Sequence, residues 1–369
     1  MADWQKEVAR LFHIVEQTFD SIKYRIGPLI NRVGSIEIIP YLGFGSREFI
    51  YLKGRVLEDT GITLSKETDR AWHNLLNMYR RFESDEIPFA RVHARFQDIE
   101  WEVVADQEGF FDIDLHLEGS LTPDPGWQTI ELKLLDPNIS GSARVRTQGQ
   151  VLIISPDAEF GVISDIDDTV VHTGVTSRLR MARTILLKNA RTRLPLKGVA
   201  SFYHALQDGN LRRAINPLFY VSSSPWNMYD LFQEFFQIHD IPAGPIFLRD
   251  WGFERESLFA VKNHQYKMDA IQKILNSFPN LQFILIGDSG EEDPEIYLRV
   301  MQSFPQRILA AYIRSVKRDL HRYDEIRTMS EQAYESGSAM ILAENTQKMV
   351  DHAAQHGWIS LSPASQPAE

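Results

Sequence analysis

The chain has 369 residues, 43% of them hydrophobic and 24% charged, so it can form two or three domains and bury at least one sizeable core. Its 39 basic and 50 acidic side chains give a net charge of −11, which argues against non-specific nucleic-acid binding by the whole chain. The absence of cysteine excludes disulfide scaffolds, thiolate zinc sites, iron–sulfur clusters and cysteine nucleophiles.

The N-terminal segment, residues 1–34, predicts one amphipathic helix. Between residues 4 and 26 the apolar side chains recur every three or four positions. The polar face mixes acids and bases, which favours packing against the protein; a position on a lipid surface is the alternative. The opening residues lack the apolar core of a signal peptide, and no window of about 18 apolar residues occurs, so we expect a cytoplasmic protein.

From residue 35 the apolar period changes to two, as in RVHARF (91–96) and IELKL (130–134). Turn sequences such as DQEG (106–109) separate these segments, and the pattern indicates about eight strands. We predict an antiparallel β-sandwich of immunoglobulin-like type over residues 35–156, with one helical insertion near 67–82. This half carries no constellation of chemical groups, so packing or recognition is its expected role.

After residue 157 short apolar runs alternate with helical patterns. The expected strands are 160–163, 218–221, 244–248, 281–286 and 307–313, and the expected helices include 226–238, 265–277 and 294–304. Strands buried on both faces and joined by helices predict a parallel α/β sheet, with its site at the carboxyl ends of the strands. This domain is expected to span residues 157–361, followed by a disordered tail, 362–369.

Four groups of polar residues follow predicted strands or open a helix. SDIDDT (164–169) places three carboxylates within four residues, a density that favours a bound cation such as Mg²⁺. SSSP (222–225), at the expected opening of a helix, offers hydroxyls and amides to an anion. Lys267 lies in the first turn of an expected helix, and GDSGEED (287–293) can complete a cation site. Taken singly, each group also fits a helix cap, a loop or a surface lysine.

Taken together and in this order, the four groups resemble the motifs of the haloacid dehalogenase superfamily of phosphotransferases. DIDDT (165–169) is similar to its first motif, Ser222 to the second, Lys267 to the third and GDSGEED to the fourth. Residues 157–315 more narrowly resemble the catalytic domain of the actin-patch-associated phosphatidate phosphatases, and lipins more distantly. The segments that carry this likeness are SDIDDTV, YVSSSPW, GPIFLR and IGDSGEEDPEIY.

The resemblance implies a Mg²⁺-dependent phosphatase. Asp165 would attack phosphorus and form an aspartyl-phosphate, and Asp167 would act first as general acid and then as general base. Asp165, the backbone carbonyl of Asp167, and Asp288 would hold Mg²⁺, while Asp293 would orient a metal-bound water or position the lysine of the third motif. Asp168 stands where the superfamily most often has glycine, a difference that leaves this mechanism intact.

The same resemblance assigns the substrate contacts. Ser222 and Lys267 would hold the phosphoryl oxygens, with further substrate contacts from Thr169 and Ser223.

A basic segment separates the first and second motifs. Residues 176–213 contain nine bases and one acid, in contrast to the acidic remainder of the chain. We predict a helical flap at about 174–213 that draws an anionic substrate or lipid surface towards the site, because helical periodicity puts three of its arginines on one face: Arg180, Arg183 and Arg191. A solvated helix face is the alternative.

The sequence therefore predicts a phosphatidate phosphatase, acting on phosphatidate at an anionic membrane surface and peripheral to that membrane. Two alternatives remain. In the first, the enzyme performs the same chemistry on a soluble phosphate ester or a phosphoprotein. In the second, which is a different class of function, the chain is a non-catalytic binding protein with a relic α/β domain. Four clustered charges (Asp165, Asp167, Lys267 and Asp288) argue against a relic, which has no chemical need for them.

Overall fold

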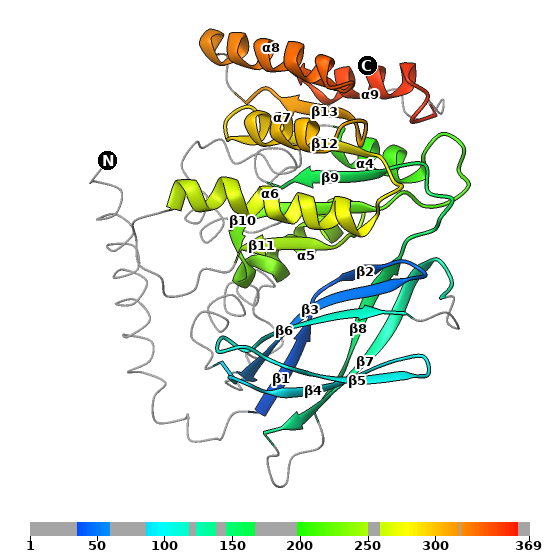
Figure 1. Ribbon diagram of the computed structural model, residues 1–369, viewed down its shortest axis with the longest axis vertical. Helices are drawn as coiled ribbons and strands as arrows, with labels where there is room; N and C mark the ends of the chain where they lie inside the picture. The colour runs from blue at the N-terminus through cyan, green and yellow to red at the C-terminus, as the bar shows by residue number, and fades with distance from the viewer. Residues whose placement is uncertain are drawn as a thin grey trace.

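The computed structural model describes residues 35–59, 86–117, 123–137, 145–166, 198–249, 259–316 and 319–360, which form two sheets with helices around the second (Figure 1). Three predicted features lie outside the described residues: the helix of residues 4–26, the insertion near 67–82 and the tail 362–369. Residues 174–197 of the predicted flap lie outside them as well. The prediction that the flap extends to residue 213 is wrong, because residues 199–208 form a helix that is buried against the second sheet. None of the helices in the described ranges has the length and apolar character needed to cross a membrane.

The N-terminal sheet contains eight strands, built from the segments with a period of two. Their bounds are β1 (Ser35–Pro40), β2 (Gly43–Gly45), β3 (Phe49–Asp59), β4 (Arg91–Phe96), β5 (Ile99–Val104), β6 (Phe110–His116), β7 (Gly126–Asp136) and β8 (Arg146–Ile153). The strand order is β1-β3-β2-β8-β7-β4-β5, and β6 also pairs with β3. All neighbouring strands are antiparallel except β2 and β8, so the predicted antiparallel sheet is confirmed.

Alternation along each strand sets the core of this sheet. In β4, Val92, Ala94 and Phe96 are buried whereas Arg91 and Arg95 are exposed, because successive side chains point to opposite faces of a strand. The buried residues of β3, β6, β7 and β8 join those of β4 in one apolar cluster. A shift of register by one residue would expose this cluster, so the pattern specifies the pairing.

The second sheet has six parallel strands in the order β11-β10-β9-β12-β13-β14. Their bounds are β9 (Gly161–Asp165), β10 (Leu218–Pro225), β11 (Ile246–Arg249), β12 (Phe283–Asp288), β13 (Ile308–Arg314) and β14 (Ala339–Ala343). The predicted parallel α/β sheet is confirmed. From β9 the chain continues to β10 and β11 at one edge of the sheet, and it then returns to β12 on the other side of β9. The strand order therefore reverses at β9. In α/β proteins, ligands bind at the carboxyl ends of the strands at such a reversal.

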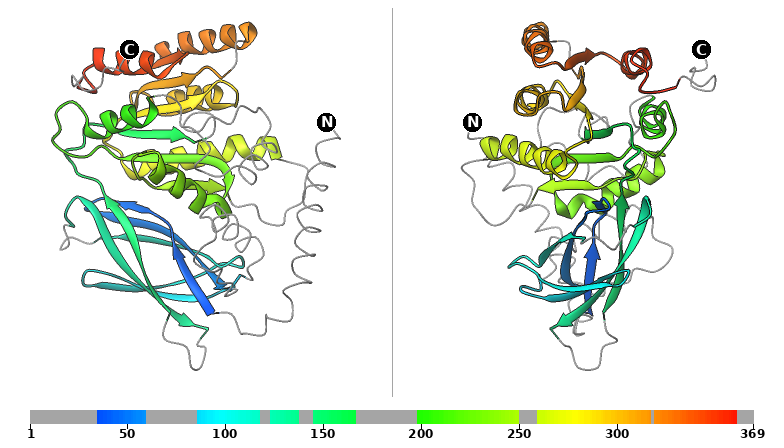
Figure 2. Two further views of the ribbon diagram at one scale, coloured as in Figure 1. Left: turned by 180° about the vertical axis from the view of Figure 1, so that it is seen from behind. Right: turned by 45° about the vertical axis from the view of Figure 1, so that its right-hand side comes forward.

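Helices cover both faces of the parallel sheet (Figure 2). The helices α4 (Val199–Asp208), α5 (Tyr229–Ile238) and α9 (Thr346–Gln355) pack on one face, and α6 (Phe259–Ser277), α7 (Asp293–Ser303) and α8 (Leu320–Glu335) pack on the other. Alternate strand residues enter the two cores: Ile284 and Ile286 face the first group, whereas Phe283 and Leu285 face the second. Burial on both faces explains why these strands are continuous apolar runs.

The two sheets are in direct contact through aromatic side chains. Phe44 of β2 is 1% exposed and packs against Phe219 of β10, with ring centroids 5.4 Å apart, and against Phe278 at 5.9 Å. Tyr41 stacks on Trp226 at 4.3 Å. Trp226 opens the 3₁₀ turn η3 (Trp226–Met228) between β10 and α5, so the β domain contacts the segment that follows the serines of the second motif.

Candidate active site

Asp165 is the last residue of β9, the central strand at which the sheet order reverses. All five residues of β9 are buried, and Asp165 is 1% exposed. Hydrogen bonding to β10 on one side and β12 on the other holds the strand, with Asp165 opposite Val221 of β10. The preceding residue, Ser164, shares a hydrogen bond of 2.7 Å with the hydroxyl of Tyr203 on α4. The predicted nucleophile therefore stands on a rigid support.

Asp288 and Asp293 lie where β12 ends and α7 begins. The backbone N–H of Asp288 donates to Oδ2 of Asp293 (3.1 Å), and Asp288 Oδ1 accepts from the N–H of Glu291 (3.0 Å). Gly287 makes this fold of the chain possible, because a Cβ at that position would lie 2.5 Å from Oδ2 of Asp293. Pro294 follows at the start of α7, where a missing N–H costs nothing.

Lys267 joins the two carboxylate groups. Its Nζ donates to Asp165 Oδ1 and Asp293 Oδ1, both at 2.7 Å, and to Glu291 Oε2 at 3.2 Å. The side chain enters from α6 and the residue is 3% exposed. The prediction that Lys267 lies in the first turn of its helix is wrong, since α6 begins eight residues earlier, at Phe259.

Burial and charge together shift the pKa values of Lys267, Asp288 and Asp293. Burial by itself would lower the pKa of Lys267, but the charges of Asp165, Asp293 and Glu291 raise it well above its usual value, so the ammonium persists. Burial, reinforced by the neighbouring acids, raises the pKa of Asp288 well above the ordinary range, and burial also raises the pKa of Asp293. Among the described residues, the single ammonium of Lys267 thus lies in a cluster of four acidic side chains: Asp165, Asp288, Asp293 and Glu291.

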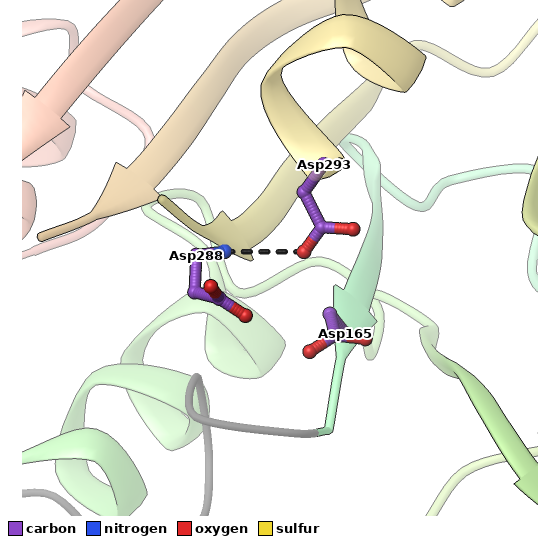
Figure 3. A group of neighbouring side chains, drawn as sticks. All are labelled: Asp165, Asp288 and Asp293. Atoms are coloured by element: carbon purple, nitrogen blue, oxygen red, sulfur yellow. Dashed lines mark hydrogen bonds between the residues drawn. The ribbon is translucent and has the colours of Figure 1, made fainter. Parts of the chain in front are cut away.

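The cluster fits a divalent cation. Asp165, Asp288 and Asp293 each present one carboxylate oxygen, the three oxygens lie within 4.8 Å of one another, and all three residues are buried (Figure 3). Asp288 Oδ2 is buried and has no hydrogen-bond partner among the described residues. Hard oxygen ligands of this kind suit Mg²⁺, which would also offset the excess negative charge.

Ser222 lies one residue beyond the position of β10 that pairs with Asp165, and it is fully buried. Its Oγ accepts from the N–H of Ser224 at 3.0 Å. The hydroxyls of Ser223 and Ser224 are buried without a hydrogen-bond partner in the described part of the chain. The expected helix 226–238 is present as η3 followed by α5, but the strand before it extends beyond the expected Val221, so the three serines belong to β10, which ends at Pro225.

Several predicted site residues lie outside the described residues, and their positions stay predictions. These are Asp167, Asp168, Thr169, Arg180, Arg183 and Arg191.

Two residues of the site were not singled out from the sequence. Glu291 pairs with Lys267, and its place within GDSGEED was the available signal. Arg322 of α8 donates to the backbone carbonyls of Ser289 (3.1 Å) and Glu291 (2.9 Å) in the same loop. No motif marks this arginine, because only the packing of α8 against α7 brings it to the loop.

The region that carries this cluster resembles known proteins. Residues 160–315 match the family model described as "Phosphatidate phosphatase APP1, catalytic domain". Phosphatidate phosphatase APP1 of Saccharomyces cerevisiae is 39% identical over 156 residues, which are 42% of this chain and 26% of that protein. An uncharacterized protein of Schizosaccharomyces pombe is 28% identical over 243 residues, 64% of this chain and 39% of that protein.

The chain thus covers well under half the length of these two relatives. Among solved structures, a carbohydrate acetylesterase from Xanthomonas citri aligns with a TM-score of 0.32 and 10% identity, over 86% of this chain and 72% of that one. A score this low carries no argument about fold or function. The family match and the yeast relative confirm the resemblance that the motifs predicted: residues 160–315 form a domain similar to the catalytic domain of phosphatidate phosphatase APP1.

Proposed function

We propose that this chain is a Mg²⁺-dependent phosphatidate phosphatase that releases diacylglycerol and phosphate through an aspartyl-phosphate intermediate. One observation carries the proposal. Asp165, Asp288, Asp293 and Lys267 converge in a buried group at the carboxyl edge of the sheet, within the region that matches the phosphatidate phosphatase catalytic domain. Strand ends at a reversal of sheet order are where α/β proteins bind their ligands.

In the proposed reaction the carboxylate of Asp165 attacks phosphorus, and the bond from phosphorus to the diacylglycerol oxygen breaks as the new bond to Asp165 forms. Asp167 gives a proton to the departing alkoxide and later removes one from the water that hydrolyses the aspartyl-phosphate. Lys267, held at 2.7 Å from Asp165 Oδ1, fixes the orientation of the nucleophile and lowers its repulsion of the phosphate.

The remaining groups hold the substrate and the cation. Asp165, Asp288 and the backbone carbonyl of Asp167 are the proposed ligands of Mg²⁺, which when bound would screen the repulsion between the carboxylates and the phosphate. Both oxygens of Asp293 already accept hydrogen bonds, one from Lys267 and one from the N–H of Asp288, so we assign Asp293 to positioning these two residues.

The phosphoryl oxygens would be bound by Ser222 and Lys267, with Thr169 and Ser223 adding contacts to the substrate. The buried Ser223 hydroxyl, which has no hydrogen-bond partner among the described residues, supports this part of the proposal.

The proposal extends to the whole chain. The α/β domain spans residues 157–361 with a haloacid dehalogenase-like fold, and residues 35–156 form an immunoglobulin-like sandwich preceded by the segment 1–34. The part of the flap before α4, residues 174–197, brings its arginines to an anionic membrane surface, so we place the protein in the cytoplasm and peripheral to a membrane. Nucleic acid is not a proposed partner, given the net charge of −11.

Phosphate release tests this function. The full chain is assayed with vesicles that contain phosphatidate, with a panel of soluble phosphate esters and with a phosphopeptide, in Mg²⁺ and in excess chelator. We expect turnover of phosphatidate that needs Mg²⁺ and is lost in Asp165→Asn while circular dichroism is unchanged, since an amide is a poor nucleophile. Asp269→Asn, an exposed acid on α6, is the matched control and should keep full activity.

Each contrary result has its own meaning. Turnover of the soluble esters or the phosphopeptide without phosphatidate would keep the chemistry and replace the substrate. Failure to release phosphate from any of them would overturn the phosphatase assignment. Substantial activity in a folded Asp165→Asn protein would remove the aspartyl-phosphate.

A further inference from the structure

Arg322, near the start of α8, makes five hydrogen bonds. Besides the carbonyls of Ser289 and Glu291, its guanidinium donates to both carboxylate oxygens of Glu295 in the first turn of α7 and to Glu325 of its own helix at 3.0 Å. The side chain is 20% exposed. Asp319 caps α8 by accepting from the N–H of Arg322, so the backbone that carries this arginine is itself held in place.

The loop that Arg322 binds connects two essential parts of the site. Asp288 precedes the loop, and Glu291 within it holds Lys267 at 3.2 Å. Further bonds hold the other side of the loop: the N–H of Ser289 donates to the carbonyl of Arg314 at 2.8 Å, and its Oγ accepts from the N–H of Val316 at 3.1 Å. A displacement of the loop would therefore move a proposed Mg²⁺ ligand and a partner of the catalytic lysine together.

We propose that Arg322 is a positioning residue that fixes the loop Ser289–Glu292, so that Asp288 is set for Mg²⁺ and Glu291 for Lys267. The proposal rests on the phosphatase function above, and it places a required residue outside residues 160–315, the part that matches the catalytic-domain model. An arginine suits this role because its planar fork can span a bidentate carboxylate and two carbonyls, whereas a lysine offers a single point charge.

The chain supplies a matched control at the opposite end of the same sheet. Arg307 precedes β13 and donates to three backbone carbonyls, those of Leu275, Phe278 and Leu281. It ties a loop to the sheet much as Arg322 does, but at the amino ends of the strands, far from the carboxylates. A substitution of Arg307 therefore measures how much an arginine of this kind contributes to the stability of the fold, with no effect on the carboxylate site.

The experiment compares Arg322→Gln, Arg322→Lys and Arg307→Gln in the full chain. Hydrogen–deuterium exchange of the Ser289–Glu292 peptide is measured without metal or substrate, and Mg²⁺ binding is measured by calorimetry. We expect faster exchange in both Arg322 variants and a Mg²⁺ dissociation constant raised about 10- to 100-fold, the usual consequence of losing a residue that orients a metal ligand. Arg307→Gln should lower the melting temperature and leave loop exchange and Mg²⁺ affinity unchanged.

Two results would overturn the proposal: loop exchange and Mg²⁺ affinity in Arg322→Gln equal to those of Arg307→Gln, or full restoration of both by Arg322→Lys. The first result would mean that Arg322 only links α7 to α8. The second would mean that a positive charge at this position is enough to hold the loop. If the unchanged protein hydrolyses no phosphate ester, the proposed function fails, and the exchange comparison still decides whether Arg322 holds the loop.

Discussion

Replacing Lys267 with methionine removes the one cation that the structure places among the buried carboxylates of the described site. Asp165, Asp293 and Glu291 would then lose hydrogen bonds of 2.7, 2.7 and 3.2 Å at once. Removing one partner of a buried ion pair costs about 3–5 kcal/mol, because the remaining charge stays buried without compensation. Methionine keeps the length and flexibility of the side chain, so this cost is electrostatic rather than a cavity effect.

The measurement is urea unfolding at neutral pH in the absence of divalent cations. We expect Lys267→Met to lower the free energy of unfolding by about 3–5 kcal/mol and to abolish phosphate release. Lys273→Met on the same helix is the control: its ammonium lies 3.4 Å from the centroid of the Tyr51 ring, and losing such a contact costs about 1 kcal/mol. Equal stability of the two variants would refute the reasoning, because it would mean that the carboxylates need no internal cation.

Three further outcomes are expected, two from contacts in the structure and one from the sequence of the flap. Phe44→Ala should lower the free energy of unfolding by about 3–5 kcal/mol in urea, since the ring fills the contact between the sheets; a loss below 1 kcal/mol would show that the contact is dispensable. Gly287→Ala should weaken Mg²⁺ binding in calorimetry, because its Cβ would displace the Asp293 carboxylate; unchanged affinity would contradict this. Replacing the flap residues Arg180, Arg183 and Arg191 with Gln should weaken binding to anionic vesicles in sedimentation assays by about two orders of magnitude, since each arginine contributes about 1 kcal/mol at such a surface. Turnover of a soluble phosphate ester should stay nearly unchanged. Equal loss in both assays would refute the surface role of these arginines.

Local patterns in the sequence were sufficient to predict both sheets and the acids of the site. Strands of the first sheet alternate because one face is buried, and strands of the second are uniformly apolar because both faces are. An acid one residue after such an apolar run, as at Asp165 and Asp288, is expected at the carboxyl edge of a parallel sheet. That placement follows from chain direction alone, and the structure confirms that the two carboxylates are neighbours.

Other features depended on contacts between segments far apart in the chain. β14 was not predicted, since AMILA is a short apolar run that becomes a strand only by pairing with β13. The serines at 222–224 have the composition of a helix cap, yet they belong to β10, between the two places, Val221 and Pro225, where that strand pairs with β11. The three-residue strand β2 is similarly defined by its neighbours β3 and β8.

The sequence by itself therefore determined which residue types carry the chemistry and at which edge of the sheet they lie. Only the tertiary structure decided how they are held: Lys267 reaches Asp165 across 102 positions of the chain, and Arg322 reaches the Ser289 carbonyl across 33. The physical reason is the distance along the chain over which each kind of interaction acts. Periodicity and capping are local properties of the chain, whereas an ion pair between distant segments depends on the packing of whole helices against the sheet.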